Sequence, residues 1–287
     1  MSFAETAALG AIAGFTIFIG LPVGRMQRVD DRLRVALAML SVGILAFIFM
    51  DVTSHGQEIV SARLDAFKND EANFAGVLGM FALLAAGFTL GTAGISAIER
   101  RLRRRSELPP LAGGDGTAVL SATEVASYET QAAASARRRA LQTGMTIAVA
   151  IGLHNFAEGL AIGVSAQAGE VALATVLVIG FSLHNATEGF GIVGPLGSTR
   201  PSWKWLGAAG LIGGGPTFIG AMVGYQVHSD ALELCFYALA GGAILYVIGE
   251  IWTGMRRYGH RTLGLLMLAT GFLAGVATDL IVSYGGG

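Results

Sequence analysis

The chain has little of what a soluble domain carries: only 14% of its 287 residues are charged, and it contains one cysteine. The single cysteine, Cys235, excludes an intrachain disulfide and a cysteine metal cluster. The zinc-protease motif H-E-x-x-H is also absent. The rest is 53% hydrophobic and rich in glycine, with a mean hydropathy of +0.61, which is typical of a protein that crosses a membrane repeatedly. We expect the lipid bilayer as a partner and no nucleic acid.

Eight apolar runs are long enough to span a bilayer, which takes about 20 helical residues. They lie at 3–24, 35–60, 73–98, 140–165, 171–194, 203–227, 231–254 and 262–284. The first run has no basic start and is long enough to span, so we expect no cleavable signal peptide. The predicted fold is an all-α integral membrane protein: one transporter-sized domain over 1–287, built as a bundle of eight transmembrane helices.

The basic residues fall almost entirely on one side of such a bundle. Seventeen of the 19 Lys and Arg residues lie in the connections after the first, third, fifth and seventh runs, and the opposite side holds only Arg63 and Lys68. Basic connections stay in the cytoplasm. We therefore predict a multi-pass protein of the cytoplasmic (inner) membrane with both termini outside. Seven or nine spans would break this agreement.

Two segments depart from plain spans. The connection 99–139 has Arg at both ends and a Gly/Ser/Ala/Thr-rich middle with Pro109-Pro110, so we predict a flexible cytoplasmic loop with a short helix near 121–136 and no attached soluble domain. Its expected role is to anchor the chain and set the topology. In the sixth run, Gly213-Gly214-Gly215-Pro216 predicts a disturbed helix.

The fourth and fifth runs carry the same motif, H-N-x-x-E-G, at 154–159 and 184–189. His and Glu four residues apart share one face of a helix. A short outer connection near 165–170 makes the two helices antiparallel neighbours, so both motifs lie at mid-membrane depth and face each other. Neutral imidazole and carboxylate oxygen suit zinc, iron(II), manganese or cadmium, and Asn155 and Asn185 add carbonyl oxygens.

Other polar residues lie in or near the spans. Asp51 and His55 repeat the four-residue spacing in the second run; we favour a functional role, with His55 completing the metal cage and Asp51 attracting cations. Glu58 is interpreted as either an entrance group or, preferably, a solvated span end. Glu250 is either an exit-side cation site or an ion-pair partner of the arginines that follow it. Asp279, near the outer end of the last run, is expected to be solvated surface.

The paired motifs, the D-x-x-x-H of the second run and the eight spans together resemble the ZIP (Zrt-, Irt-like) family of divalent metal transporters, in its bacterial form. The resemblance covers essentially the whole chain. It implies a metal site between the second, fourth and fifth helices, and a neighbouring second site. The residues it assigns to metal are His154, Glu158, His184, Glu188, Asn155, Asn185 and His55. It assigns Asp51 and Glu250 to the transport pathway. Glu58 is a third pathway candidate on its position alone and is not assigned by the resemblance. The chain departs from many members at Ala157 and Thr187, where proline is common.

The resemblance implies transport of divalent transition metals into the cytoplasm, zinc first and iron, manganese or cadmium next. The metal is then a bound substrate; no cofactor and no enzymatic activity are expected. One alternative is an intramembrane metal-dependent hydrolase, which needs an open coordination position and a water-activating acid. Another is a receptor or scaffold whose polar motifs only join helices. The sequence leaves the oligomeric state open, a homodimer included.

Overall fold

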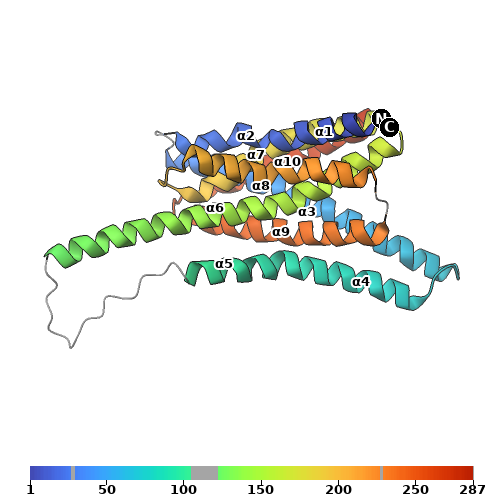
Figure 1. Cartoon of the computed structure of the whole chain (residues 1–287), viewed down its shortest axis with the longest axis horizontal. Helices are drawn as coiled ribbons and strands as arrows, with labels where there is room; N and C mark the ends of the chain where they lie inside the picture. The colour runs from blue at the N-terminus through green and yellow to red at the C-terminus, as the bar shows by residue number, and fades with distance from the viewer. Residues whose placement is uncertain (27–29, 105–121, 227–228, 287) are drawn as a thin grey trace.

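The structure is a computed structural model, and it describes residues 1–26, 30–104, 122–226 and 229–286. Those residues form a bundle of long helices and no strand (Figure 1). In chain order the elements are α1 (Phe3–Phe15), α2 (Ile17–Gly20), η1 (Leu21–Arg25), α3 (Asp31–Lys68), α4 (Phe74–Thr89), η2 (Leu90–Gly94), α5 (Ile95–Arg104), α6 (Ala122–Gln167), α7 (Val171–Val193), η3 (Gly194–Leu196), α8 (Trp203–Gly224), α9 (Asp230–Arg256) and α10 (Arg261–Gly286).

The predicted eight spans are confirmed in number and place. Within the described ranges, eight helical segments are long and apolar enough to cross a membrane. Two of them are composite: α1, α2 and η1 form the first, and α4, η2 and α5 form the third. The segments are Phe3–Arg25, Asp31–Lys68, Phe74–Leu102, Thr123–Gln167, Val171–Leu196, Trp203–Gly224, Asp230–Arg256 and Arg261–Ile281.

Several helices begin where a short polar side chain can accept a hydrogen bond from the exposed first-turn amides. The backbone N–H of Leu33 donates to Asp30 Oδ1 at 2.7 Å, and that of Gly76 donates to Asn73 Oδ1 at 2.8 Å. Ser2 and Glu5 form a reciprocal capping box at the start of α1. These caps fix the starts of α1, α3 and α4.

The connection 99–139 is more helical than the sequence indicated. Residues 99–104 continue α5, and residues 122–139 belong to the single long helix α6, in place of the separate short helix expected near 121–136. The central part, 105–121, lies outside the described residues. The reason for the difference is that 122–139 has Ala, Glu, Gln and Arg at most positions and no Gly or Pro, so α6 extends well beyond the bundle (Figure 1).

The disturbed helix expected around Pro216 is not observed, because α8 runs unbroken from Trp203 to Gly224. Pro216 has no N–H for the carbonyl of Ile212. Helix α6 approaches α8 closely at this level: a side chain at Gly152 would overlap the Ile212 carbonyl oxygen. Close backbone packing through glycine therefore supports α8 where its own hydrogen bond is missing, and the helix continues past Pro216.

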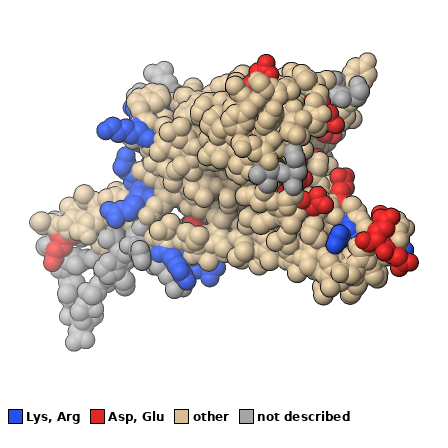
Figure 2. Space-filling view, turned by 45° about the vertical axis from the view of Figure 1, so that its right-hand side comes forward, with Lys and Arg blue, Asp and Glu red and all other residues tan. Residues whose placement is uncertain are grey.

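Charge separates along the long axis of the bundle. Lys and Arg gather at one end and most Asp and Glu at the other (Figure 2). The two chain ends lie together at the end opposite the basic connections (Figure 1). This arrangement in space agrees with the alternation of basic connections seen in the sequence.

Candidate metal centre

The two H-N-x-x-E-G motifs meet in the middle of the bundle. Helices α6 and α7 are joined by a tight turn at 168–170, where Gly169 has a positive φ of 83°. The helices therefore run antiparallel and bring 154–158 beside 184–188. Both motifs are in α-helix, so each His and its Glu lie on the same face, one turn apart. The two motifs therefore lie side by side in the structure, as the sequence predicts.

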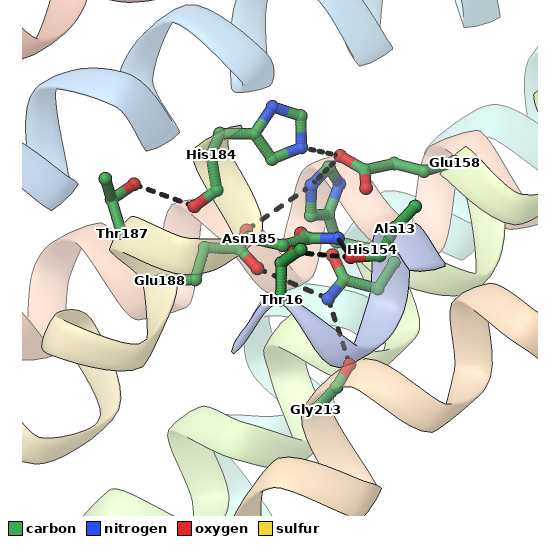
Figure 3. Close-up of polar contacts among 10 residues, drawn as sticks. Ala13, Thr16, His154, Glu158, His184, Asn185, Thr187, Glu188 and Gly213 are labelled. Carbon is green, nitrogen blue, oxygen red and sulfur yellow. Dashed lines mark hydrogen bonds and ion pairs between the residues drawn. The ribbon is translucent and has the colours of Figure 1, made fainter. Parts of the chain in front are cut away.

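His154, Glu158 and His184 form a group whose ligand atoms all lie within 4.8 Å of one another (Figure 3). His154 Nε2 lies 2.8 Å from Glu158 Oε1, and His184 Nε2 is hydrogen-bonded to the same oxygen. His154 is fully buried and Glu158 is 5% exposed. Two imidazole nitrogens and one carboxylate oxygen that converge in this way make a group that could hold a divalent metal ion.

Glu188 lies at the edge of this group. Its Oε1 is 3.6 Å from His154 Nε2, and its Oε2 accepts a hydrogen bond of 3.2 Å from Asn155 Nδ2. Three buried atoms here have no hydrogen-bond or close ion-pair partner among the described residues: His154 Nδ1, Glu158 Oε2 and, apart from the 3.6 Å approach of His154, Glu188 Oε1. Buried polar atoms without partners are costly, and a bound cation would satisfy them.

The two asparagines are anchored differently. Asn155 Nδ2 also donates to the carbonyl of Gly213 in α8 at 2.9 Å, whereas Asn185 Nδ2 donates to the carbonyl of Ala13 in α1 at 3.1 Å. Both side chains are fully buried, and both Oδ1 atoms lack a hydrogen-bond partner in the described structure. Only Asn155 touches a carboxylate of the centre. The second metal site on the two asparagines therefore stays a prediction.

A cavity of about 520 Å³ leads to the centre. His154, Glu158 and His184 lie on its wall, and it reaches toward the acidic end, where its lining includes Leu173 near the start of α7. Asp51 in α3 lines it too. The remaining wall is mostly aliphatic and aromatic, and no Lys or Arg belongs to the described lining. Within the described lining, the ionisable side chains that can carry charge near neutral pH are therefore carboxylates and histidines.

His55 lies in this cavity but outside the group of converging ligands. Its Nδ1 is 3.0 Å from the backbone oxygen of Asp51 and 3.7 Å from Asp51 Oδ1, and half of its side chain is exposed. Its ring packs on Tyr237 of α9, with centroids 5.6 Å apart. The structure therefore places His55 one helical turn beyond Asp51 in the cavity, and the three close ligands come from α6 and α7 alone.

The other two predicted pathway residues lie elsewhere. Glu58 is exposed and lines a neighbouring hollow of about 1120 Å³ together with Arg63 and Asp230. Glu250 is half-buried in α9, toward the basic end, and does not line the cavity of the metal centre. Neither residue contributes to the group of converging ligands.

Asp279 of α10 is exposed, as expected of solvated surface, and it also lines the cavity of the metal centre. The sequence contained a usable signal. Gly271, Gly275 and Asp279 repeat at four-residue intervals and so share one helix face, which glycine marks as the packed face. Without the partner helix, however, the sequence does not say what that face meets.

Packed isoleucines lie beside the centre on its basic side. Ile151 precedes His154 by one turn toward the basic end of α6, and Ile192 follows Glu188 by one turn toward the basic end of α7. Both are at most 1% exposed and belong, with Ile17, to the main apolar core. Within α6 and α7 the path from the centre toward the basic end is therefore filled by apolar side chains, whereas along α3 the cavity lining extends from Leu40 to His55.

No family model matches the chain, and no curated protein matches it. The metal centre therefore depends on its own geometry: converging buried ligands, unpartnered polar atoms, and a cavity without basic residues. What the fold and site define is a class, namely a multi-pass helical membrane protein with a His/Glu group suited to a divalent cation.

Proposed function

We propose that this protein transports divalent transition-metal cations, zinc first among them, across the membrane and into the cytoplasm, as its motifs' resemblance to the ZIP family implies. The observation that carries the proposal is the convergence of His154, Glu158 and His184 on the wall of a cavity. Buried ionisable groups in membrane helices are expensive and generally mark an ion or substrate path. Cadmium, iron(II) and manganese fit the same donors.

In this proposal the ion loses water as protein ligands replace its hydration shell. Imidazole nitrogens from both helices and the Glu158 carboxylate supply the first ligands, and Glu188 adds a second carboxylate 3.6 Å from His154. Two carboxylates balance the charge of a divalent cation in a site of low dielectric. Because the ligands must be free of protons, binding releases protons from the site.

Release on the other side requires the packed isoleucines to separate. Glycines at which a side chain would overlap a backbone carbonyl of a neighbouring helix link the helices into three sets. In the first set, Gly159 and Gly220 join α6 to α8, Gly14 and Gly214 join α1 to α8, and Gly20 and Gly189 join α2 to α7. In the second, Gly43 and Gly271 join α3 to α10; in the third, Gly91 of η2 meets α9 and Gly242 of α9 meets α4. The centre belongs to the first set, so we propose that this set rocks against the other helices.

The proposed orientation has the basic end in the cytoplasm and both termini outside, in the cytoplasmic membrane. Basic connections resist translocation, and Figure 2 shows Lys and Arg gathered at one end. The cavity then opens outward, and the packed isoleucines lie on the cytoplasmic side of the centre. Acidic residues at the outer end of the bundle attract cations, which is consistent with import. The direction of transport itself is proposed from the resemblance to the ZIP family.

The test is uptake of Zn²⁺ or Cd²⁺ into vesicles that contain the purified protein. His154→Ala, Glu158→Ala, His184→Ala and Glu188→Ala should each reduce uptake at least about tenfold, because each removes a ligand of the centre. His260→Ala and Glu71→Ala, which alter exposed residues far from the cavity, are the matched controls. Near-normal transport by all four inserted variants would refute the proposal.

The same vesicles separate transport from the hydrolase alternative. A transporter exchanges its ion and delivers it to the lumen, whereas a hydrolase retains its metal and turns over an ester, amide or peptide. A scaffold role predicts neither metal binding nor transport, and loss of folding when the motifs are removed.

A further inference from the structure

A second cavity lies at the basic end of the bundle, where Lys and Arg gather (Figure 2). Its volume is about 440 Å³, and no residue of the metal centre belongs to its described lining. Three arginines line it, Arg25, Arg34 and Arg200, and Asp31 is the one acidic residue of the described lining. The cavity therefore carries an excess of positive charge, in contrast to the cavity of the metal centre.

Two of the arginines are held by uncharged partners. Arg25 Nη1 donates to the carbonyl of Pro201, and the Arg25 guanidinium lies 4.7 Å from the centre of the Trp203 ring. Arg34 Nη1 donates to the hydroxyl of Tyr258 at 3.2 Å, and the Arg34 guanidinium lies 5.2 Å from the centre of that ring. These contacts fix the positions of the two guanidinium groups and leave their charge uncompensated.

The acidic residue of the lining offsets little of this charge. Asp31 Oδ1 lies 3.6 Å from Arg34 Nη1, and 56% of the Asp31 side chain is exposed. An exposed ion pair of this kind is screened by water and contributes little. Arg200 is exposed and has no ion pair in the described parts of the chain. At least two guanidinium charges therefore remain for an anion.

The chemistry and the place of the cavity favour a phosphate group. Guanidinium groups bind phosphate oxygens through paired, charge-assisted hydrogen bonds. Trp203, which lies against Arg25 and is 63% exposed, belongs to a residue type that gathers at the level of the lipid headgroups. In the proposed orientation this end faces the cytoplasmic leaflet, where anionic phospholipids bind basic pockets between spans. The expected ligand is therefore an anionic headgroup.

The three arginines come from two of the helix sets. Arg25 ends η1, which continues α2, and Arg200 follows η3, which continues α7, so both belong to the set that holds the metal centre. Arg34 belongs to α3, in the second set. Phe190 of α7 and Leu37 of α3 line the same cavity. A phosphate group bound to all three arginines would therefore connect the two sets at the basic end.

We infer that Arg25, Arg34 and Arg200 form a binding site for the phosphate group of an anionic phospholipid, and that the bound phosphate holds the basic end of the protein closed. The inference rests on the proposed function, because the movement of the first set against α3 that releases the metal ion would also separate these arginines. The phosphate group stabilises the arrangement seen in this structure and slows transport. It does not touch the metal ligands, so it should not raise the KM for the metal.

The test of binding is thermal unfolding of the purified, metal-free protein in detergent. Phosphatidylglycerol should raise the Tm at least about 2 °C more than phosphatidylcholine does, because a ligand that binds the folded protein stabilises it. Arg200→Gln should remove this difference. Lys204→Gln is the matched control, because it removes a positive charge from the same connection, outside the described cavity lining, and it should keep the difference.

Inorganic phosphate distinguishes the two sources of the same chemical group. A Tm shift with phosphatidylglycerol but not with inorganic phosphate supports a lipid headgroup as the ligand. A shift with inorganic phosphate alone would overturn the lipid assignment. Equal shifts in wild type and Arg200→Gln, or no shift with either compound, would overturn the site itself.

The test of the effect on transport is initial-rate uptake at saturating Cd²⁺ into phosphatidylcholine vesicles with and without phosphatidylglycerol. Phosphatidylglycerol should lower kcat about threefold in wild type and in Lys204→Gln, and it should leave kcat unchanged in Arg200→Gln. A wild-type kcat that phosphatidylglycerol leaves unchanged or raises would overturn the closing role. Failure of the proposed function would instead appear as uptake that His154→Ala does not change, whereas the Tm shift does not depend on transport.

Discussion

Asn155 and Asn185 occupy the same place in two copies of one motif, yet the structure gives them different tasks. Asn155 Nδ2 donates to Glu188 Oε2 at 3.2 Å and to the Gly213 carbonyl at 2.9 Å. Asn185 Nδ2 donates to the Ala13 carbonyl at 3.1 Å and touches no carboxylate of the centre. We therefore predict that Asn155→Ala weakens metal binding much more than Asn185→Ala does.

The magnitude follows from the hydrogen bonds that are lost. Each substitution removes a buried hydrogen bond to a backbone carbonyl, which costs about 0.5–1.5 kcal/mol of stability. The Ala13 carbonyl keeps its hydrogen bond from the Thr16 hydroxyl at 2.6 Å. The two variants should therefore lose similar thermal stability. Only Asn155→Ala also removes the amide that donates a hydrogen bond to the Glu188 carboxylate and orients it. Loss of such an orienting contact lowers metal affinity about 10- to 100-fold. Asn185→Ala should stay within about threefold of wild type, since its lost contact is to α1.

The assay is calorimetric titration of the purified protein with Cd²⁺, alongside thermal unfolding of the metal-free protein in the same detergent. The unfolding data show whether both variants are folded and destabilised to the same extent. Equal losses of affinity in the two variants would refute the reasoning. That result would also be expected if both Oδ1 atoms were ligands of a second ion, so anomalous scattering from Cd²⁺ at the two asparagines would then show which atoms bind.

Two further predictions concern packing and pH. Gly220→Ala should destabilise the protein by about 1–3 kcal/mol, because the added Cβ would overlap the Phe156 carbonyl of α6. The control is Gly215→Ala in the same helix, where the added Cβ meets nothing within 4 Å, and this change should be neutral or stabilising. Thermal unfolding in detergent compares the two, and equal melting temperatures would contradict the close α6–α8 contact. Apparent Cd²⁺ affinity should fall at least about tenfold between pH 7.5 and 5.5, because protons compete with the metal ion for the imidazole and carboxylate ligands. Titrations in matched buffers test this, and an affinity that is flat from pH 8 to 5 would exclude histidine as a ligand.

Much of the fold followed from local properties of the chain. Span number depends on the length of apolar runs, and a helix that crosses lipid must satisfy its own backbone, so little else can form there. The sequence therefore predicted eight spans correctly. It predicted an interruption at Pro216, but α8 continues through this residue, where α6 packs closely against it at Gly152. It also underestimated α6, where good helix formers extend the helix far beyond the apolar run.

The candidate site divides in the same way. By itself the sequence determined the ligand types and their shared helix face, because a four-residue spacing and a repeated motif are properties of one helix and its copy. It also indicated that α6 and α7 are antiparallel, since the connection between them is short. These two properties of the sequence alone predict that His154, Glu158 and His184 lie together.

Only the tertiary structure decided which equivalent residues differ and which distant residues meet. The motif treats Asn155 and Asn185 alike, but their amides reach different neighbours because α8 packs on one side and α1 on the other. Asp279 and Asp51 line one cavity because parallel α3 and α10 pack in register at Gly43 and Gly271. Such relations depend on helix–helix packing between residues 58, 172 and 228 positions apart in the chain, and no local pattern encodes them.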